Sequence, residues 1–144
     1  MRPQRQLIEH KPSVGRYGDC QRTCVAVILD LDASEVPHFC DDPNASRGTP
    51  QWWSERQKAW LAERGLTCAT FAYDGLTANL AQVLEWTSCQ NPDVPMILCG
   101  TSSLGSNHVV VVLDGEIACD PSGNGIVGPT REGTWEISVI SVAA

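Results

Sequence analysis

The sequence predicts an α+β fold in which helices pack on an antiparallel sheet. Apolar residues recur at helical spacing in three segments of the first two-thirds of the chain, whereas the last third is made of strand-like runs. Helices that come first and strands that come last favour an antiparallel sheet with helices packed on it. The 144 residues fit one domain, spanning 1–144, that is large enough to bury a core of its own.

The first helix is predicted over about 20–30, with a cysteine at its start. Asp19 is a good N-cap, because its carboxylate can accept a backbone N–H of the first turn. Cys20 then occupies the first helical position, where the helix dipole and the unpaired N–H groups favour a thiolate and lower the thiol pKa. A reactive thiol at the end of a buried helix is typical of a cysteine nucleophile. A small buried cysteine with no chemical role is the alternative.

Two further helices are expected. One begins at Thr49-Pro50, where a capping hydroxyl precedes a proline in the first turn, and it ends at Gly65. The other begins at the cap Thr77 and continues through Trp86. Residues 41–48 are rich in turn formers and predict a surface loop.

Five segments are predicted as strands. Residues 66–73 alternate loosely, and 94–99 form a short buried run. Residues 108–113 are too rich in β-branched side chains for a helix, and 116–120 return after a turn. Residues 134–142 alternate cleanly, so that one face of this last strand is buried.

The hairpin between the third and fourth of these strands decides whether His108 can meet Asp120. A two-residue turn at Asp114-Gly115 would pair Val109 with Asp120 and place His108 on the opposite face. A three-residue loop would shift the pairing by one and bring the Cβ atoms of His108 and Asp120 to about 5 Å. We predict the three-residue register, or a bulge with the same effect.

In that geometry the three residues have defined roles. Asp120 accepts a hydrogen bond from one ring nitrogen of His108, and the other nitrogen takes the proton of Cys20. The thiolate attacks a carbonyl carbon, and His108 returns the proton to the leaving group. Taken alone, a histidine that opens a strand is more often structural, and an aspartate before proline is usually part of a turn. The conjunction of the three residues in this chain order is what indicates chemistry.

The composition excludes several functions. A net charge of −7 argues against nucleic acid and against an anionic membrane surface as partners. No signal peptide or membrane span is predicted, so the simplest interpretation is a cytoplasmic protein with reduced thiols. The seven cysteines include no C-x-x-C pair, which argues against a zinc ribbon. Cys20, Cys24 and His108 lack a clear fourth ligand, so no metal and no cofactor is expected. The remaining cysteines are predicted to be structural.

These motifs resemble the papain-like cysteine peptidases. Asp19-Cys20-x-x-x-Cys24 is similar to the nucleophile helix of bacteriocin-processing (double-glycine leader) peptidases, in which the first cysteine of this spacing attacks. Small uncharacterised papain-like proteins of bacteria and phages show a similar set of motifs. The matching segments are Gly18-Asp19-Cys20, the stretch from Leu31 through Val36-Pro37-His38-Phe39, His108-Val109-Val110-Val111 and Asp120-Pro121-Ser122-Gly123.

The resemblance implies a papain-like α+β fold, with the nucleophile helix packed on an antiparallel sheet. It also implies an oxyanion donor, which in this family is a glutamine a few residues before the nucleophile. Val14 stands six residues before Cys20 and cannot donate. Gln6 or Gln4 is expected to supply this group if the N-terminal arm folds across the helix, and the alternative is the backbone N–H of Cys20 with that of a neighbour.

The expected function is a cysteine peptidase or amidase with Cys20, His108 and Asp120 as its catalytic triad. Its substrate is a peptide or a small molecule with an amide or isopeptide bond, and Asp19 and Asn107 are candidate substrate contacts. An acyl transferase that uses the same triad is one alternative. A bacterial or phage protein that binds a ligand in the cleft without catalysis is the other.

Overall fold

The computed structural model describes residues 1–41 and 52–144. Trp52 is described only as the first residue of a helix. Short 3₁₀ turns occupy Pro12–Val14 and Ala33–Glu35. In the described residues the helices and strands are α1 (Cys20–Leu29), α2 (Trp52–Ala62), β1 (Leu66–Asp74), α3 (Leu80–Gln90), β2 (Met96–Thr101), β3 (Asn107–Leu113), β4 (Glu116–Cys119) and β5 (Thr134–Val142).

The described strands form one sheet in the order β1-β5-β2-β3-β4, and each neighbouring pair is antiparallel. β5 comes last in the chain but lies between β1 and β2, and β1 pairs along its whole length with β5, from Leu66 opposite Val142 to Asp74 opposite Thr134. These pairings confirm the predicted α+β class with an antiparallel sheet.

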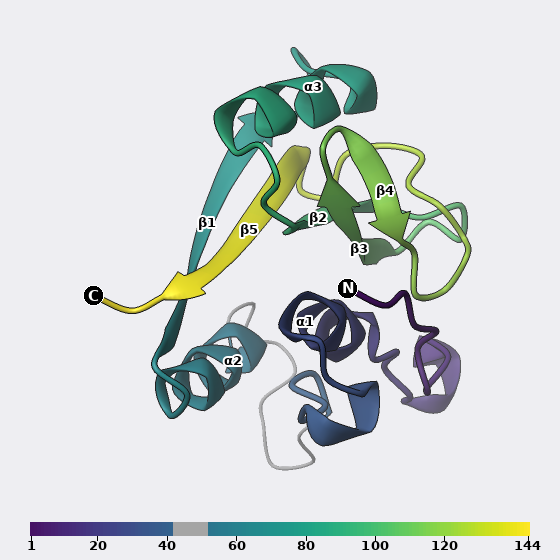
Figure 1. The fold of residues 1–144 in the computed structure, drawn as a ribbon. Coiled ribbons are helices and arrows are strands. Elements are labelled where there is room, and N and C mark those ends of the chain that lie inside the picture. The colour runs from purple at the N-terminus through teal and green to yellow at the C-terminus, as the bar shows by residue number, and fades with distance from the viewer. Residues whose placement is uncertain (42–51) are drawn as a thin grey trace.

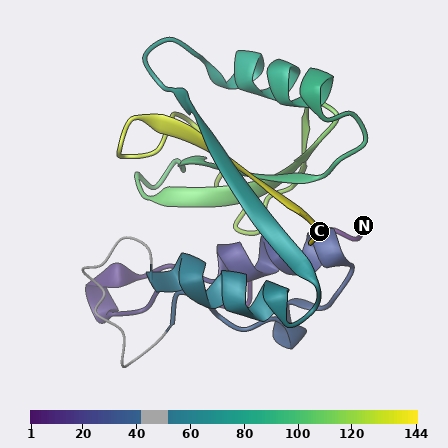
Figure 2. The same cartoon turned by 90° about the vertical axis from the view of Figure 1, so that its left-hand side faces the viewer.

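The helices lie on both faces of the sheet. In Figures 1 and 2, α3 covers one face while α1 and α2 lie against the other. The side chains of β3 are accordingly buried on both faces. Val109 and Val111 pack with the core beneath α1, whereas Val110 and Val112 pack with the core beneath α3. A strand buried on both faces reads as a continuous apolar run, which is why β3 shows no alternation.

The helix boundaries agree with the sequence to within a few residues, with two exceptions. α3 is capped by Asn79, not by Thr77 as predicted, because Asn79 and Gln82 form a reciprocal capping box. The predicted start of α2 at Thr49-Pro50, with the loop over 42–48, lies outside the described residues. None of the helices in 1–41 and 52–144 is long and apolar enough to span a bilayer.

The N-terminal arm, residues 1–19, is extended and crosses from the end of β4 to the start of α1. The Gln6 backbone N–H donates to Pro121 O at 3.0 Å, and the Asp19 N–H donates to Ile8 O at 3.3 Å. Gly15, with φ of +71°, closes the tight turn that lets the arm double back between Lys11 and Arg16. The arm therefore lies beside the start of α1 and the loop that follows β4.

Replacing Leu98 by alanine tests the central position of β2. Leu98 is fully buried and pairs with Val110 and Ile137 on either side. The cavity left by the smaller alanine side chain would be enclosed by the sheet and the core, which can collapse into it only in part. Leu98→Ala should therefore lower the free energy of unfolding by about 2–5 kcal/mol, as measured by urea denaturation. Leu76→Ala is the control, because Leu76 is 96% exposed; a similar loss in both variants would contradict this core.

Candidate functional site

Cys20 is the first residue of α1, as predicted, and is partly exposed to a cavity. Burial raises the pKa of its thiol, while the backbone N–H groups of Val109, Gln21 and Cys20 lower it and the negative charge of Asp19 raises it. The net result is a pKa of about 11. The predicted lowering of the thiol pKa was therefore wrong, because desolvation outweighs the amides of the helix start. Cys20 is a neutral thiol at pH 7.

Asp19 has a different role from the two predicted for it. Its carboxylate makes no capping bond to α1; instead it accepts hydrogen bonds from the backbone N–H groups of Ile8 at 2.8 Å and Leu7 at 3.3 Å. It also pairs with Arg22 Nε at 2.8 Å and is fully buried. A carboxylate that is enclosed and fully engaged cannot contact substrate, so Asp19 fastens the arm to α1.

His108 and Asp120 meet as the sequence predicted, through a bulge, which is the second of the two predicted arrangements. The turn is the two-residue Asp114-Gly115, both with positive φ, and not the three-residue loop. A β-bulge then shifts the register, so that Val112 faces Ile117 while Val111 faces Cys119. The extra residue moves Asp120 to the face of His108, and the two side chains approach diagonally.

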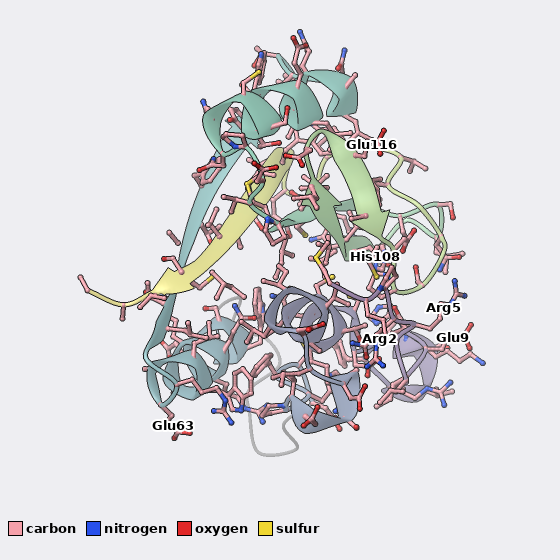
Figure 3. The ribbon with its side chains drawn as sticks, in the orientation of Figure 1. Arg2, Arg5, Glu9, Glu63, His108 and Glu116 are labelled. Carbon is pink, nitrogen blue, oxygen red and sulfur yellow. The ribbon has the colours of Figure 1, made fainter. Side chains whose placement is uncertain are left out.

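The contact between the two side chains is direct. His108 Nε2 lies 2.7 Å from Asp120 Oδ1 and 3.0 Å from Ser122 Oγ (Figure 3 labels His108). With Nε2 engaged in this way, Nδ1 is the nitrogen that remains for chemistry. His108 is itself only 6% exposed, so its ring orientation is held by packing as well as by Asp120.

Asp120 is held ionised by the loop that follows it. The backbone N–H of Gly125 donates to Oδ2 at 2.8 Å, and that of Gly123 donates to Oδ1 at 3.1 Å. Burial raises the pKa of Asp120, but the hydrogen bonds from His108, Gly125 and Gly123 outweigh this effect. The pKa of Asp120 therefore lies below its usual value. A carboxylate at this place stabilises a positive charge on His108.

One cavity of about 420 Å³ brings the predicted residues together. Cys20, His108, Gln6 and Asn107 all line it, and Asp120 lies behind His108. The walls come from the N-terminal arm, the start of α1, and the loops after β2 and β4. A cavity of this size is in the range of small-molecule and peptide subsites.

Cys20 and His108 approach the cavity from different directions. The sulfur lies near the amide of Val109, a residue that faces α1, whereas strand alternation gives His108 the parity of Val110. In the described part of the chain no hydrogen bond joins Cys20 Sγ to His108. Transfer of the Cys20 proton to His108 Nδ1 therefore requires one of two things. Either the imidazole turns toward the thiol, or a water molecule relays the proton between them.

Gln6, and not Gln4, is the glutamine at the cavity. Its side-chain amide donates from Nε2 to Ile8 O at 2.8 Å, while Oε1 is buried without a hydrogen-bond partner among the described residues. Gln4 lies away from the cavity, where it donates to Leu31 O at 2.6 Å and accepts from the Ala33 N–H at 2.9 Å. Of the two glutamines expected as oxyanion donors, Gln6 is therefore the one that reaches the cavity, and Gln4 is engaged elsewhere.

Asn107 lines the cavity beside His108, but both ends of its amide are engaged. Nδ2 donates to Glu132 Oε2 at 2.9 Å, and Oδ1 accepts the Arg131 backbone N–H at 2.8 Å. These contacts tie the start of β3 to the turn before β5. A contact between Asn107 and substrate stays a prediction.

Two residues at the site were missed by the sequence analysis. Ser122 Oγ bridges His108 and Asp120, and His10 lines the cavity wall formed by the arm. His10 Nδ1 accepts the Gly18 N–H at 3.1 Å, and burial, followed by the charge of His108, lowers its pKa. The arm has no hydrophobic periodicity, so nothing in the sequence places His10 near Cys20.

Of the other candidates of the sequence, Cys24 and His38 do not line the main cavity, whereas Cys40 does. Cys24 is fully buried in the core beneath α1, and His38 Nε2 lies 3.0 Å from Tyr17 O and faces a second cavity. Cys40 shares the main cavity, but burial raises its pKa to about 12. Within 1–41 and 52–144 no group of three His, Cys, Asp or Glu side chains is arranged to hold a metal ion.

Comparison with protein-family models, with curated proteins and with solved structures gives no match for this chain.

Removing the Asp19 carboxylate should release the arm. Because Asp19→Ala leaves Arg22 and two amides without their buried partner, it should cost about 3–5 kcal/mol in urea denaturation. Hydrogen exchange at the Leu7 and Ile8 amides should also become faster. Glu63→Ala, which removes an exposed carboxylate paired with Arg64 at 3.8 Å, is the control. A loss below about 1 kcal/mol for Asp19→Ala, as at a surface pair, would show that the arm is held by other contacts.

Proposed function

We propose that the protein is a papain-like cysteine hydrolase that cleaves an amide bond through a thioester on Cys20. The observation that carries the proposal is one cavity lined by Cys20 and His108, in which His108 is bonded through Nε2 to the ionised Asp120 at 2.7 Å. Nucleophile, base and orienting carboxylate in this relation are the components of acyl transfer by a cysteine enzyme.

The proposed reaction starts from a neutral thiol. The Cys20 proton passes to Nδ1 of His108 as the sulfur attacks the amide carbon, and Asp120 stabilises the imidazolium that forms. Collapse of the tetrahedral intermediate breaks the C–N bond, and His108 gives its proton to the departing nitrogen. Neutral His108 then takes a proton from water, whose oxygen attacks the thioester. The acid is released and the proton returns to sulfur.

The negative oxygen of the intermediate needs donors in the same cavity. The N–H of Cys20 belongs to the first turn of α1 and has no partner within the helix. Gln6 Nε2 uses one hydrogen on Ile8 O, and its second hydrogen is the side-chain donor in this proposal. Loss of one such donor costs on the order of 10²–10³ in rate.

A non-catalytic binding protein is the second candidate, and the chemistry of Cys20 favours it. A thiol with a pKa of about 11, without a hydrogen bond to the nearby imidazole, is a poor nucleophile until His108 moves toward it. An acyl transferase would use the same triad but would pass the acyl group to an amine instead of water.

Acylation by p-nitrophenyl acetate tests the catalytic proposal. Cys20 should acquire the acetyl group ahead of the other six cysteines, as read by mass spectrometry of the digested protein. Cys20→Ser should abolish this modification, and His108→Ala should slow it by about 10²–10⁴-fold because the base is lost. Cys40→Ser is the matched control, since Cys40 lines the same cavity. Slow acetylation of all cysteines alike would favour the binding protein.

The pH dependence of this acylation distinguishes a neutral thiol from a preformed ion pair. In the proposed reaction His108 removes the proton of the thiol as the sulfur attacks, so that no thiolate has to be present beforehand. The rate should therefore not fall in mild alkali, because Cys20 remains a thiol up to about pH 11. An ion-pair enzyme would instead lose rate when its imidazolium deprotonates. The rate is measured from about pH 5 to about pH 10 against the Cys20→Ser blank.

The products separate a hydrolase from a transferase. When the acetylated protein is incubated with and without glycine methyl ester, a hydrolase releases mainly acetate in both cases. A transferase releases the acetylated amine whenever the amine is present.

A further inference from the structure

Arg5 brings to the cavity a positive charge that is not paired with any carboxylate of residues 1–41 and 52–144. The two nearby carboxylates are engaged elsewhere: Glu9, at the cavity wall, pairs with Lys11 at 3.3 Å, and Asp120, behind His108, pairs with His108 and backbone N–H groups. Arg5 has no carboxylate partner among the described residues, although the chain carries a net charge of −7. Figure 3 shows Arg5, Glu9 and His108 on the same side of the molecule.

The guanidinium of Arg5 is nevertheless held in place. Its Nη2 donates to Ser122 O at 3.1 Å, and a Cβ added at Gly123 would lie 2.7 Å from its Nη1. The next residue of the arm, Gln6, donates its backbone N–H to Pro121 O at 3.0 Å. Arg5 is thus positioned by the loop that carries Asp120, with most of its five N–H donors left for a ligand.

We propose that Arg5 binds a carboxylate of the substrate, so that the protein acts on amides that carry an acidic function close to the scissile bond. This inference rests on the proposed function and deepens it. An arginine fork donates two parallel hydrogen bonds to one carboxylate, which gives both affinity and orientation.

Arg5 and His108 line the same cavity and are joined through Ser122. The carbonyl of Ser122 accepts from Arg5, while its hydroxyl lies 3.0 Å from His108 Nε2. The carboxylate that Arg5 would bind is therefore one that lies near the scissile amide, such as a chain-terminal carboxylate or an acidic side chain.

A pair of alkylating probes that differ in a single charge tests this inference. In both N-iodoacetylglycine and N-iodoacetylglycinamide, the Cys20 sulfur bonds to the CH₂ carbon and iodide is released. Only the first probe carries a carboxylate. The rate ratio of acid to amide at Cys20 should be about tenfold or more in the native protein, which corresponds to one charge-assisted hydrogen bond. Arg5→Gln should bring the ratio to about one.

The matched control is Arg131→Gln, which removes the same charge from an exposed residue outside the cavity lining and should leave the ratio unchanged. Equal rates for both probes in the native protein would overturn the inference. A ratio that survives Arg5→Gln would also overturn it, because the preference would then arise elsewhere.

A second measurement separates the failure of this inference from failure of the proposed function. Cys20→Ser protein is titrated with N-acetylglycine and with N-acetylglycinamide while the backbone amides of Ser122 and Gly123 are followed by NMR. Shifts caused by the acid alone, and lost in Arg5→Gln, support the carboxylate site even if Cys20 is never acylated. Absence of such shifts rejects the site even if Cys20 proves catalytic.

Discussion

The buried carboxylate of Asp19 is the interaction on which the candidate site depends. It accepts the amides of Leu7 and Ile8 and pairs with Arg22, while its own N–H donates to Ile8 O. An isolated buried charge would be costly, but here hydrogen bonds compensate for the lost water. The residues of the arm that reach the cavity, among them Arg5, Gln6 and His10, are placed there by this attachment.

The bulge between β3 and β4 is the second constraint. A regular two-residue hairpin would have put His108 and Asp120 on opposite faces of the sheet. One extra residue in β4 reverses the parity of Asp120 without changing the turn, and the loop that follows supplies N–H donors that keep the carboxylate ionised. The proposed orientation of the base therefore depends on a local irregularity of the backbone.

Burial raises the pKa of both Asp120 and Cys20, but the net result differs between the two groups. The hydrogen bonds around Asp120 overcome its desolvation, whereas those around the Cys20 sulfur do not, and its pKa rises to about 11. In the proposed reaction, a thiol with this pKa depends on His108 to remove its proton. A substrate whose binding in the cavity turns the imidazole toward the sulfur would be activated selectively, since the unliganded protein holds no preformed thiolate.

The sequence by itself determined the elements and their order, because apolar periodicity and turn residues act over a few positions. It indicated the helix that starts at Cys20, the run of β-branched residues in β3 and the alternation of β5. It also predicted that His108 and Asp120 meet, since a hairpin offers only a small number of registers.

Only the tertiary structure decided what surrounds these residues. Asp19 does not cap α1 but binds the backbone of the N-terminal arm, because the arm folds back over the start of α1. The arm has no hydrophobic periodicity, so no local pattern of the sequence fixes its course. The raised pKa of Cys20 likewise depends on how completely distant segments exclude water from the sulfur. Both are long-range effects, whereas local sequence patterns describe only what neighbouring residues do to one another.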